Sequence, residues 1–129
     1  MSELGSERPP ESVPLVRVIA MPADTNANGD IFGGWLMSQM DLAAGSMAQR
    51  AARGRCATVA VDAMSFLRPV KVGDEVSVYG ELLSTGRTSM KIAIEAWRRA
   101  RMGSEEFRVT KAVFTFVAID DEGRPRTLA

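Results

Sequence analysis

The sequence contains no histidine and a single cysteine, and these two scarcities exclude several kinds of chemistry. Without histidine, neither a Ser-His-Asp triad nor a Cys-His pair can form. Histidine-containing metal sites are excluded as well, and one thiol cannot replace them, so we expect no metal. Acid–base chemistry must come from carboxylates, lysine, tyrosine or water.

The lone cysteine, Cys56, has no partner for an internal disulfide, which fits a reducing compartment. We expect it to be a small buried residue at the start of a strand. Residues 1–14 are polar, carry three prolines and lack the apolar run of a signal peptide. No stretch approaches the roughly 20 apolar residues of a membrane helix. The sequence thus predicts a cytoplasmic protein without a membrane partner, with a flexible N-terminal arm over 1–14.

An excess of charge of one sign is also missing, because 16 Lys and Arg residues balance 16 Asp and Glu residues. Proteins that bind nucleic acid usually carry a basic surplus, so we expect no nucleic-acid partner. This balance still permits a local basic patch for a phosphorylated small molecule. The 129 residues, 46% of them hydrophobic, suffice for one globular domain with one core, which we place at 15–129.

The pattern of apolar residues predicts one helix and five strands. A β-branched run at 15–21 indicates the first strand, and a polar loop at 22–30 follows it. The helix at 33–53 is rich in Leu, Met, Ala and Gln, and we expect Gly54 to end it. The remaining strands are predicted at 57–67, 75–82 (half-exposed), 90–97 and 107–119.

The predicted helix is apolar around most of its circumference, which favours burial on most sides. The simplest arrangement is an α+β fold, in which a curved five-stranded antiparallel sheet wraps around one long central helix. A sheet this small has edges to cover, so we also expect a homo-oligomer.

Asp41 is the most unusual residue of the predicted helix. Its neighbours three and four positions away are Met37, Ser38, Ala44 and Gly45. A carboxylate among apolar and small residues is costly to bury without a partner, and the small side chains leave room for a ligand or a second helix. The alternative is a structural carboxylate that pairs with an arginine or is capped by a neighbour in a subunit interface.

Gly33 and Gly34 begin the same helix, where free backbone N–H groups could stabilise the oxyanion of a thioester. The alternative is steric, since glycines also permit a tight entry into a helix. Within one chain Asp41 lies about 10–12 Å beyond these glycines along the helix axis. One reacting carbon therefore cannot touch the glycine N–H groups and the Asp41 carboxylate of the same chain. Two antiparallel helices across a two-fold axis would bring the glycines of one chain to the aspartate of the other.

Two basic turns complete the candidate site. Guanidinium groups and hydroxyls suit the phosphates of a nucleotide, although each residue alone could equally be a solvated turn residue. The residues concerned are Arg87, Thr88 and Ser89 in one turn, and Arg124 and Arg126 in the other.

The run AMPADTNANGDIFGGWLMSQMD, residues 20–41, closely resembles the signature of YciA-type bacterial acyl-CoA thioesterases. The similarity continues in TVAVDAMSFLRPVKVGDEVSVYG (58–80), GRTSMKI (86–92), AVFTFVAID (112–120) and GRPRT (123–127). This resemblance implies a hot-dog fold and hydrolysis of acyl-CoA to a free acid and CoA, with no metal or other cofactor. It also implies a homodimer as the catalytic unit, assembled into a trimer of dimers.

The resemblance further implies roles for individual residues. Asp41 would act as general base or nucleophile, with Gly33, Gly34 and Asn28 beside it at the thioester. An apolar tunnel lined by residues such as Met37, Met40 and Phe66 would take the acyl chain. The substrate-binding residues would be Asp30, Met37, Thr58, Arg87, Thr88, Ser89, Arg124 and Arg126.

Three other functions are possible for such a fold. Hot-dog dehydratases use a histidine, which this chain lacks. A non-catalytic acyl-CoA-binding module would keep the cleft but would not need the carboxylate of Asp41. A purely structural dimer would bind no CoA at all.

Overall fold

The computed structural model of the chain describes residues 7–62 and 64–128. The first six residues of the arm predicted over 1–14 therefore lie outside the described residues. Residues 7–14 form neither helix nor strand. Among the described residues, no helix is long and apolar enough to cross a membrane.

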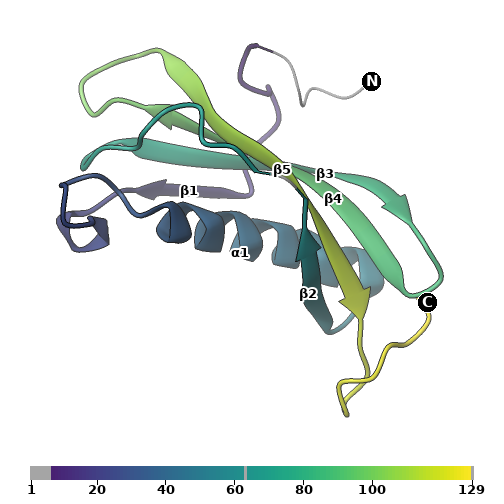
Figure 1. Ribbon diagram of the computed structural model, residues 1–129. Helices are drawn as coiled ribbons and strands as arrows, with labels where there is room; N and C mark the ends of the chain where they lie inside the picture. Colours follow the sequence, from purple (N-terminus) through teal and green to yellow (C-terminus); the bar gives the residue numbers. More distant parts are fainter. Residues whose placement is uncertain (1–6, 63, 129) are drawn as a thin grey trace.

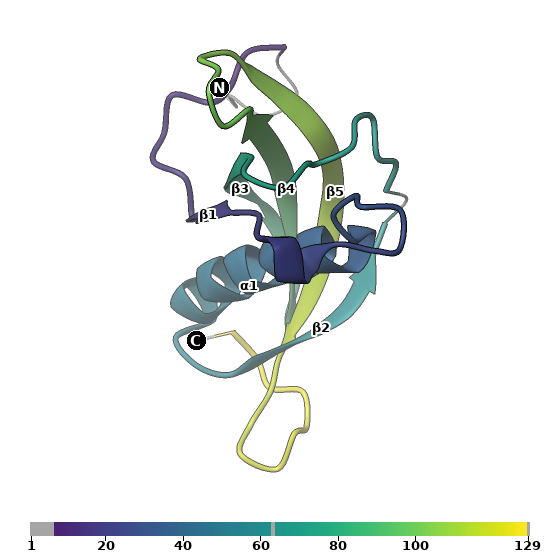
Figure 2. The ribbon, with the colours of Figure 1, turned by 90° about the vertical axis from the view of Figure 1, so that its left-hand side faces the viewer.

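One helix packs against one antiparallel sheet (Figure 1). The sheet has five strands in the order β1-β3-β4-β5-β2, so β1 and β2 form its edges (Figure 2). The predicted α+β fold is confirmed, with strands joined by short turns from β3 onward. The elements are β1 Val16–Ile19, the 3₁₀ turn η1 Pro22–Asp24, α1 Gly33–Ala52, β2 Cys56–Val61, β3 Glu75–Thr85, β4 Ser89–Arg99 and β5 Glu106–Ala118.

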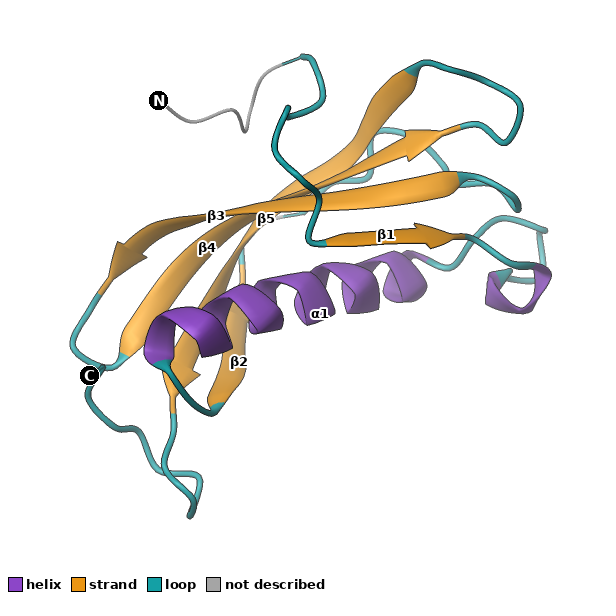
Figure 3. Cartoon of the chain, turned by 180° about the vertical axis from the view of Figure 1, so that it is seen from behind, coloured by secondary structure: helices purple, strands orange, loops and turns teal. Residues whose placement is uncertain are grey.

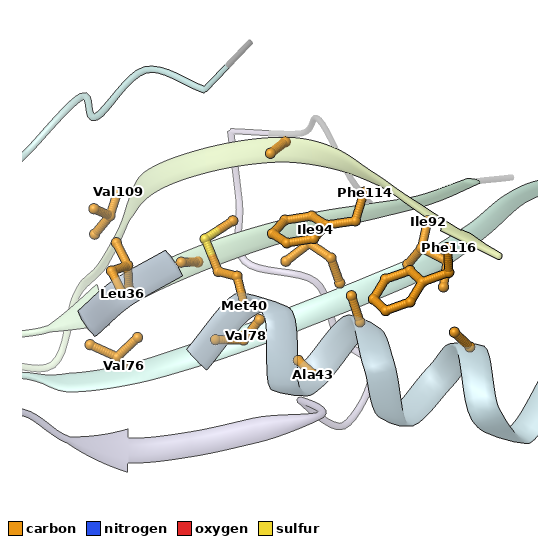
Figure 4. Packing of buried hydrophobic residues seen from close by; sticks show 14 of the residues in the cluster. Leu36, Met40, Ala43, Val76, Val78, Ile92, Ile94, Val109, Phe114 and Phe116 are labelled. Carbon is orange, nitrogen blue, oxygen red and sulfur yellow. The ribbon is translucent and has the colours of Figure 1, made fainter. Parts of the chain in front are cut away.

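The core lies between α1 and the concave face of the sheet. Alternate residues of a strand share one face, and these are the apolar ones in β3, β4 and β5. Figure 4 shows them meeting the helix. The main core residues are Val76, Val78, Ile92, Ile94, Phe114 and Phe116 from the strands and Leu36, Met40, Ala43 and Ala44 from the helix.

The expectation that α1 is buried on most sides is wrong for the single chain. Met37 and Leu42 are exposed by 39% and 64%, while the buried residues of α1 all face the sheet. The reason is geometric, since five strands curve around only one side of the helix. Figure 3 shows the sheet on one side of α1 only, so the outer side of the helix, which carries Met37 and Leu42 among polar residues, remains uncovered, as does the outer edge of β2.

The strand predicted at 57–67 ends earlier, at Val61. Beyond it the described residues leave the regular ladder but keep separate backbone hydrogen bonds to β5, from Asp62 N–H to the Val113 carbonyl and from Leu67 N–H to the Val109 carbonyl. The segment leaves the sheet so that the ring of Phe66 packs against Gly33 at the start of α1. This contact brings residues 66–70 to the candidate site.

Two smaller expectations also need correction. The left-handed residue that ends α1 is Arg53, with φ 55°, and not Gly54. β3 is not uniformly half-exposed, because residues 76–79 are all buried while residues 82–85 are exposed on both faces. Ser77 and Tyr79 on the outer face are covered, and Ser77 accepts a hydrogen bond from Arg17.

Candidate active site

The carboxylate of Asp41 is held by a hydroxyl from the neighbouring edge strand. Thr58 Oγ1, in β2, donates a hydrogen bond of 2.6 Å to Asp41 Oδ1, in α1. Asp41 is half-buried and, among the described residues, takes part in no ion pair. The described residues thus contain no arginine that pairs with Asp41. The carboxylate oxygens keep lone pairs that are available to accept a proton or to attack a carbonyl carbon.

Asp41 and Thr58 lie in the middle of an open groove between α1 and β2. Two adjoining depressions share both residues, with volumes of about 370 and 350 Å³. Gly34 and Met37 line the first depression, and Cys56 lines the second. The groove therefore joins the predicted general base to one of the predicted helix-start glycines.

The start of α1 presents unpaired N–H groups. The N-terminal cap is Phe32, which supplies no side-chain hydrogen bond. Its carbonyl accepts from the N–H groups of Trp35 and Leu36, while those of Gly33 and Gly34 have no partner among the described residues. Because the helix dipole adds positive potential here, these two donors suit a developing oxyanion.

Gly34 has no steric reason to be glycine within the single chain. A methyl group added there would touch nothing within 4 Å. At Gly33 the same methyl group would lie 3.4 Å from the ring of Phe66, which is ordinary contact. The open space beside Gly34 thus leaves room for a group from outside the chain.

The loop before α1 is shaped by Asn26, which the sequence reasoning did not single out. Its Oδ1 accepts hydrogen bonds from the N–H groups of Asn28 (2.9 Å) and Asp30 (3.1 Å). Asp30 forms an ion pair with Lys71, also missed, and this pair ties the loop to the segment after Phe66. Asn28 is exposed at the tip. The signal in the sequence was an Asn two residues before an Asn-Gly turn, a common Asx-turn pattern.

A partly open, mainly apolar pocket of about 210 Å³ lies beside the helix start. Phe66 lines it, as expected for an acyl tunnel, whereas Met37 lines the open groove and Met40 is fully buried in the core. The complete lining is Ile31, Phe32, Gly33, Leu36, Phe66, Arg68, Pro69, Val70 and Val109.

The predicted phosphate-binding turns lie at the other end of α1 (Figure 3). The β3–β4 turn is tied to the C-terminal segment, because Leu128 N–H donates to the Arg87 carbonyl and Ala118 N–H to the Thr88 carbonyl. Ser89, half-buried, begins β4. Arg87 is exposed, so its guanidinium is accessible to a ligand.

Arg124 and Arg126 differ from each other. Arg124 is exposed and forms only a surface pair of 3.9 Å with Glu122. Arg126 instead donates to the carbonyls of Ala52 (3.0 Å) and Ile119 (3.1 Å), so it satisfies the C-terminal end of α1. The structure thus engages Arg126 in holding the fold rather than presenting it to a phosphate.

Cys56 is half-buried rather than fully buried at the start of β2. Burial raises the pKa of its thiol above the ordinary value, and the nearby charge of Arg126 only partly offsets this. A raised pKa disfavours the thiolate, so Cys56 is not a nucleophile candidate although it lines the groove.

Comparisons with known proteins agree with this fold. The sequence model of the thioesterase superfamily matches residues 28–104. The acyl-CoA thioester hydrolase YciA of Escherichia coli is 50% identical and covers 92% of this chain and 92% of its own length. The structure of a hexameric broad specificity acyl-coenzyme A thioesterase superposes with a TM-score of 0.88 at 51% identity, over 95% of this chain and 84% of that chain. A hexameric hotdog fold thioesterase of Campylobacter jejuni gives 0.85 at 33% identity, over 92% and 91%.

Proposed function

This chain belongs to the thioesterase superfamily and has the hot-dog fold, and from that premise we propose that it is an acyl-CoA thioester hydrolase. It would convert an acyl-CoA and water into a free carboxylic acid and CoA. The observation that carries this proposal is the carboxylate of Asp41, which Thr58 orients in an open groove near unpaired N–H groups. The lone, unpaired Cys56 favours a reducing, cytoplasmic location.

The catalytic unit in this proposal is a dimer. Gly34 lies seven residues before Asp41, about 10 Å along the helix, so one chain alone does not bring both to one carbon. Antiparallel packing of two α1 helices would place Gly33 and Gly34 of one protomer opposite Asp41 of the other. The exposed Met37 and Leu42 on the uncovered side of α1 and the free edge of β2 support this arrangement, and two of the similar proteins are hexameric, which fits a trimer of such dimers.

In the proposed mechanism, the thioester carbonyl oxygen accepts hydrogen bonds from the N–H groups of Gly33 and Gly34. Asp41 then takes a proton from water, and the resulting hydroxide attacks the carbonyl carbon. Alternatively, the carboxylate attacks directly and water hydrolyses the mixed anhydride. The C–S bond breaks in either route and CoA leaves as a thiolate, a good leaving group that needs no strong general acid.

The two ends of α1 have different roles in this proposal. The loop with Asn28 and Asp30 would line the thioester site at the start of the helix. The turn of Arg87, Thr88 and Ser89, with the exposed Arg124, would contact the phosphates of CoA. No cofactor is proposed, and among the described residues no three acidic or cysteine side chains gather closely enough to hold a metal.

Asp41→Asn tests this function. Release of free CoA is followed with a thiol reagent, and we expect kcat to fall by about 10²–10⁴-fold, as for loss of a general base. Acyl-CoA binding should be retained, since the amide is isosteric. Asp121→Asn, in the exposed C-terminal turn, is the matched control and should keep wild-type activity. Binding without turnover in the wild type would support the non-catalytic binding module, and absence of binding would support a structural dimer.

A further inference from the structure

A fully buried hydroxyl on β5 has no part in the mechanism above, yet it holds the segment beside the helix start. Thr110 is 0% exposed, and its Oγ1 donates a hydrogen bond of 2.7 Å to the Ser65 carbonyl. We propose that Thr110 is a positioning residue, which keeps the ring of Phe66 against Gly33 and so fixes the N–H donors for the oxyanion. This role rests on the proposed function and adds a residue that acts on the same site from a distance.

The helix start needs support from outside α1. Its first two residues are glycines, whose backbone is more flexible than that of any other residue, and helix ends fray. The N-terminal cap, Phe32, supplies no side-chain hydrogen bond, and the helical bonds begin only with the N–H groups of Trp35 and Leu36. A contact that restrains Gly33 therefore also restrains the direction in which the unpaired N–H groups point.

Phe66 supplies this contact from a distant part of the chain. A methyl group added at Gly33 would lie 3.4 Å from Cζ and 3.6 Å from Cε2 of the Phe66 ring, so the ring packs directly over the start of the helix. The side chain of Phe66 is 46% exposed. Packing thus covers only part of the ring, and the backbone that carries it must be held as well.

The backbone on either side of Phe66 belongs to no helix or strand and is tied to β5. Among the described residues, three hydrogen bonds to β5 hold residues 65–68. They run from Thr110 Oγ1 to the Ser65 carbonyl (2.7 Å), from Leu67 N–H to the Val109 carbonyl (2.7 Å) and from Arg68 Nη1 to the Arg108 carbonyl (2.8 Å). The bond from Thr110 holds the N-terminal side of Phe66, and a substitution can remove it without altering the backbone.

The alternative is that Thr110 only stabilises the fold, since a buried hydroxyl needs an acceptor wherever it lies. Its loss would then leave kcat of the folded protein unchanged. If Thr110 acts through Phe66, its loss lets the ring move away from Gly33, and a misplacement of about 1 Å at a reacting group costs up to about 100-fold in rate. Because Thr110 is fully buried, it does not touch the substrate, and KM should change little.

The first experiment compares kcat and KM for butyryl-CoA in the oligomeric enzyme, at a temperature where each variant is folded. Thr110→Val replaces the hydroxyl with a methyl group and should lower kcat about 10–100-fold while KM stays within about twofold. Thr110→Ser keeps the hydroxyl and should retain most of kcat. Thr115→Val makes the same change at a half-buried position of β5 and is the matched control. Wild-type kcat in folded Thr110→Val would overturn the proposal.

A second variant tests whether the effect passes through the ring. Phe66→Ala removes a side chain that is 46% exposed, so it should fold even if Thr110→Val does not, and it should lower kcat to a similar extent. In the Phe66→Ala background, Thr110→Val should lower kcat no further, because the two residues act as one unit. Additive losses, or wild-type kcat in Phe66→Ala, would contradict the proposal.

Fluorine NMR separates this inference from the proposed function, because it needs no turnover. The 5 phenylalanines are replaced by 4-fluorophenylalanine, and the Phe66 signal is assigned by its absence from Phe66→Leu. In Thr110→Val this signal should shift toward that of the free amino acid, while Thr110→Ser and Thr115→Val keep the wild-type position. An unmoved signal would overturn the inference even if every acyl-CoA is hydrolysed. A shifted signal in a protein that hydrolyses no acyl-CoA would support the hold on Phe66 and refute the proposed function.

Discussion

Removal of the Thr58 hydroxyl tests whether it orients the catalytic carboxylate. The isosteric change Thr58→Val abolishes a hydrogen bond of 2.6 Å to Asp41, a short, charge-assisted contact. Such bonds contribute about 1.5–3 kcal/mol, and at 1.36 kcal/mol per tenfold in rate kcat should fall by about 10–150-fold. The lower end applies if the groove stays open to solvent, and the upper end applies if a second protomer covers it.

The kinetic pattern distinguishes two roles for Thr58. If it acts through Asp41, kcat falls while KM changes little; if it contacts the substrate directly, KM rises. The assay is CoA release at saturating and limiting butyryl-CoA. Thr58→Ser, which keeps the hydroxyl, should retain most of the activity. Because the same hydrogen bond joins β2 to α1 in the folded chain, the free energy of unfolding should also fall, by at most about 1.5–3 kcal/mol, so the kinetics are measured at a temperature where Thr58→Val stays folded. Wild-type kcat in Thr58→Val together with an inactive Asp41→Asn would refute the reasoning.

Three further predictions concern the helix ends and the thiol. Gly34→Ala should raise the free energy of unfolding by up to about 1 kcal/mol, because alanine favours a helix and its methyl group meets no atom within 4 Å. The same methyl group should lower kcat by crowding the N–H donors at the helix start. An unchanged kcat would show that the glycine has only a conformational role. Arg126→Ala should destabilise the chain by about 1–3 kcal/mol in chemical denaturation, whereas Arg124→Ala should be neutral. Since burial raises the pKa of Cys56, its alkylation by iodoacetamide at pH 8 should be slower than that of a free thiol and should accelerate as the pH rises; a rate equal to that of free cysteine would contradict this.

Much of the fold was predictable because its signals are local. The change from a helical apolar period to a period of two after residue 56 marks where α1 gives way to strands, and β4 and β5 follow their predicted ranges within two residues. The misplaced strand end shows the limit of this reasoning. Residues 62–67 look like a strand by composition, but Phe66 contacts Gly33 instead of continuing the sheet.

The candidate site was predictable in its residue types and less so in its contacts. Asp41 stood out because a carboxylate on an apolar helix is locally unusual. Its partner Thr58 is 17 residues away on another element, so no periodicity indicates that their side chains meet. Arg126 shows the opposite case, since a basic turn residue resembling a phosphate contact donates instead to Ala52, 74 residues earlier.

The sequence by itself determined the chemistry that is available: no histidine, one thiol, a helix with glycines at its start and a carboxylate two turns later. These features depend on residue identity and on spacing along one helix, and both are readable from the chain. Only the tertiary structure decided which distant groups touch: Thr58 with Asp41, Phe66 with Gly33, and the walls that give the pocket its volume. The physical reason is that such contacts depend on how the sheet curves around α1, a property of the whole packed core rather than of any one segment.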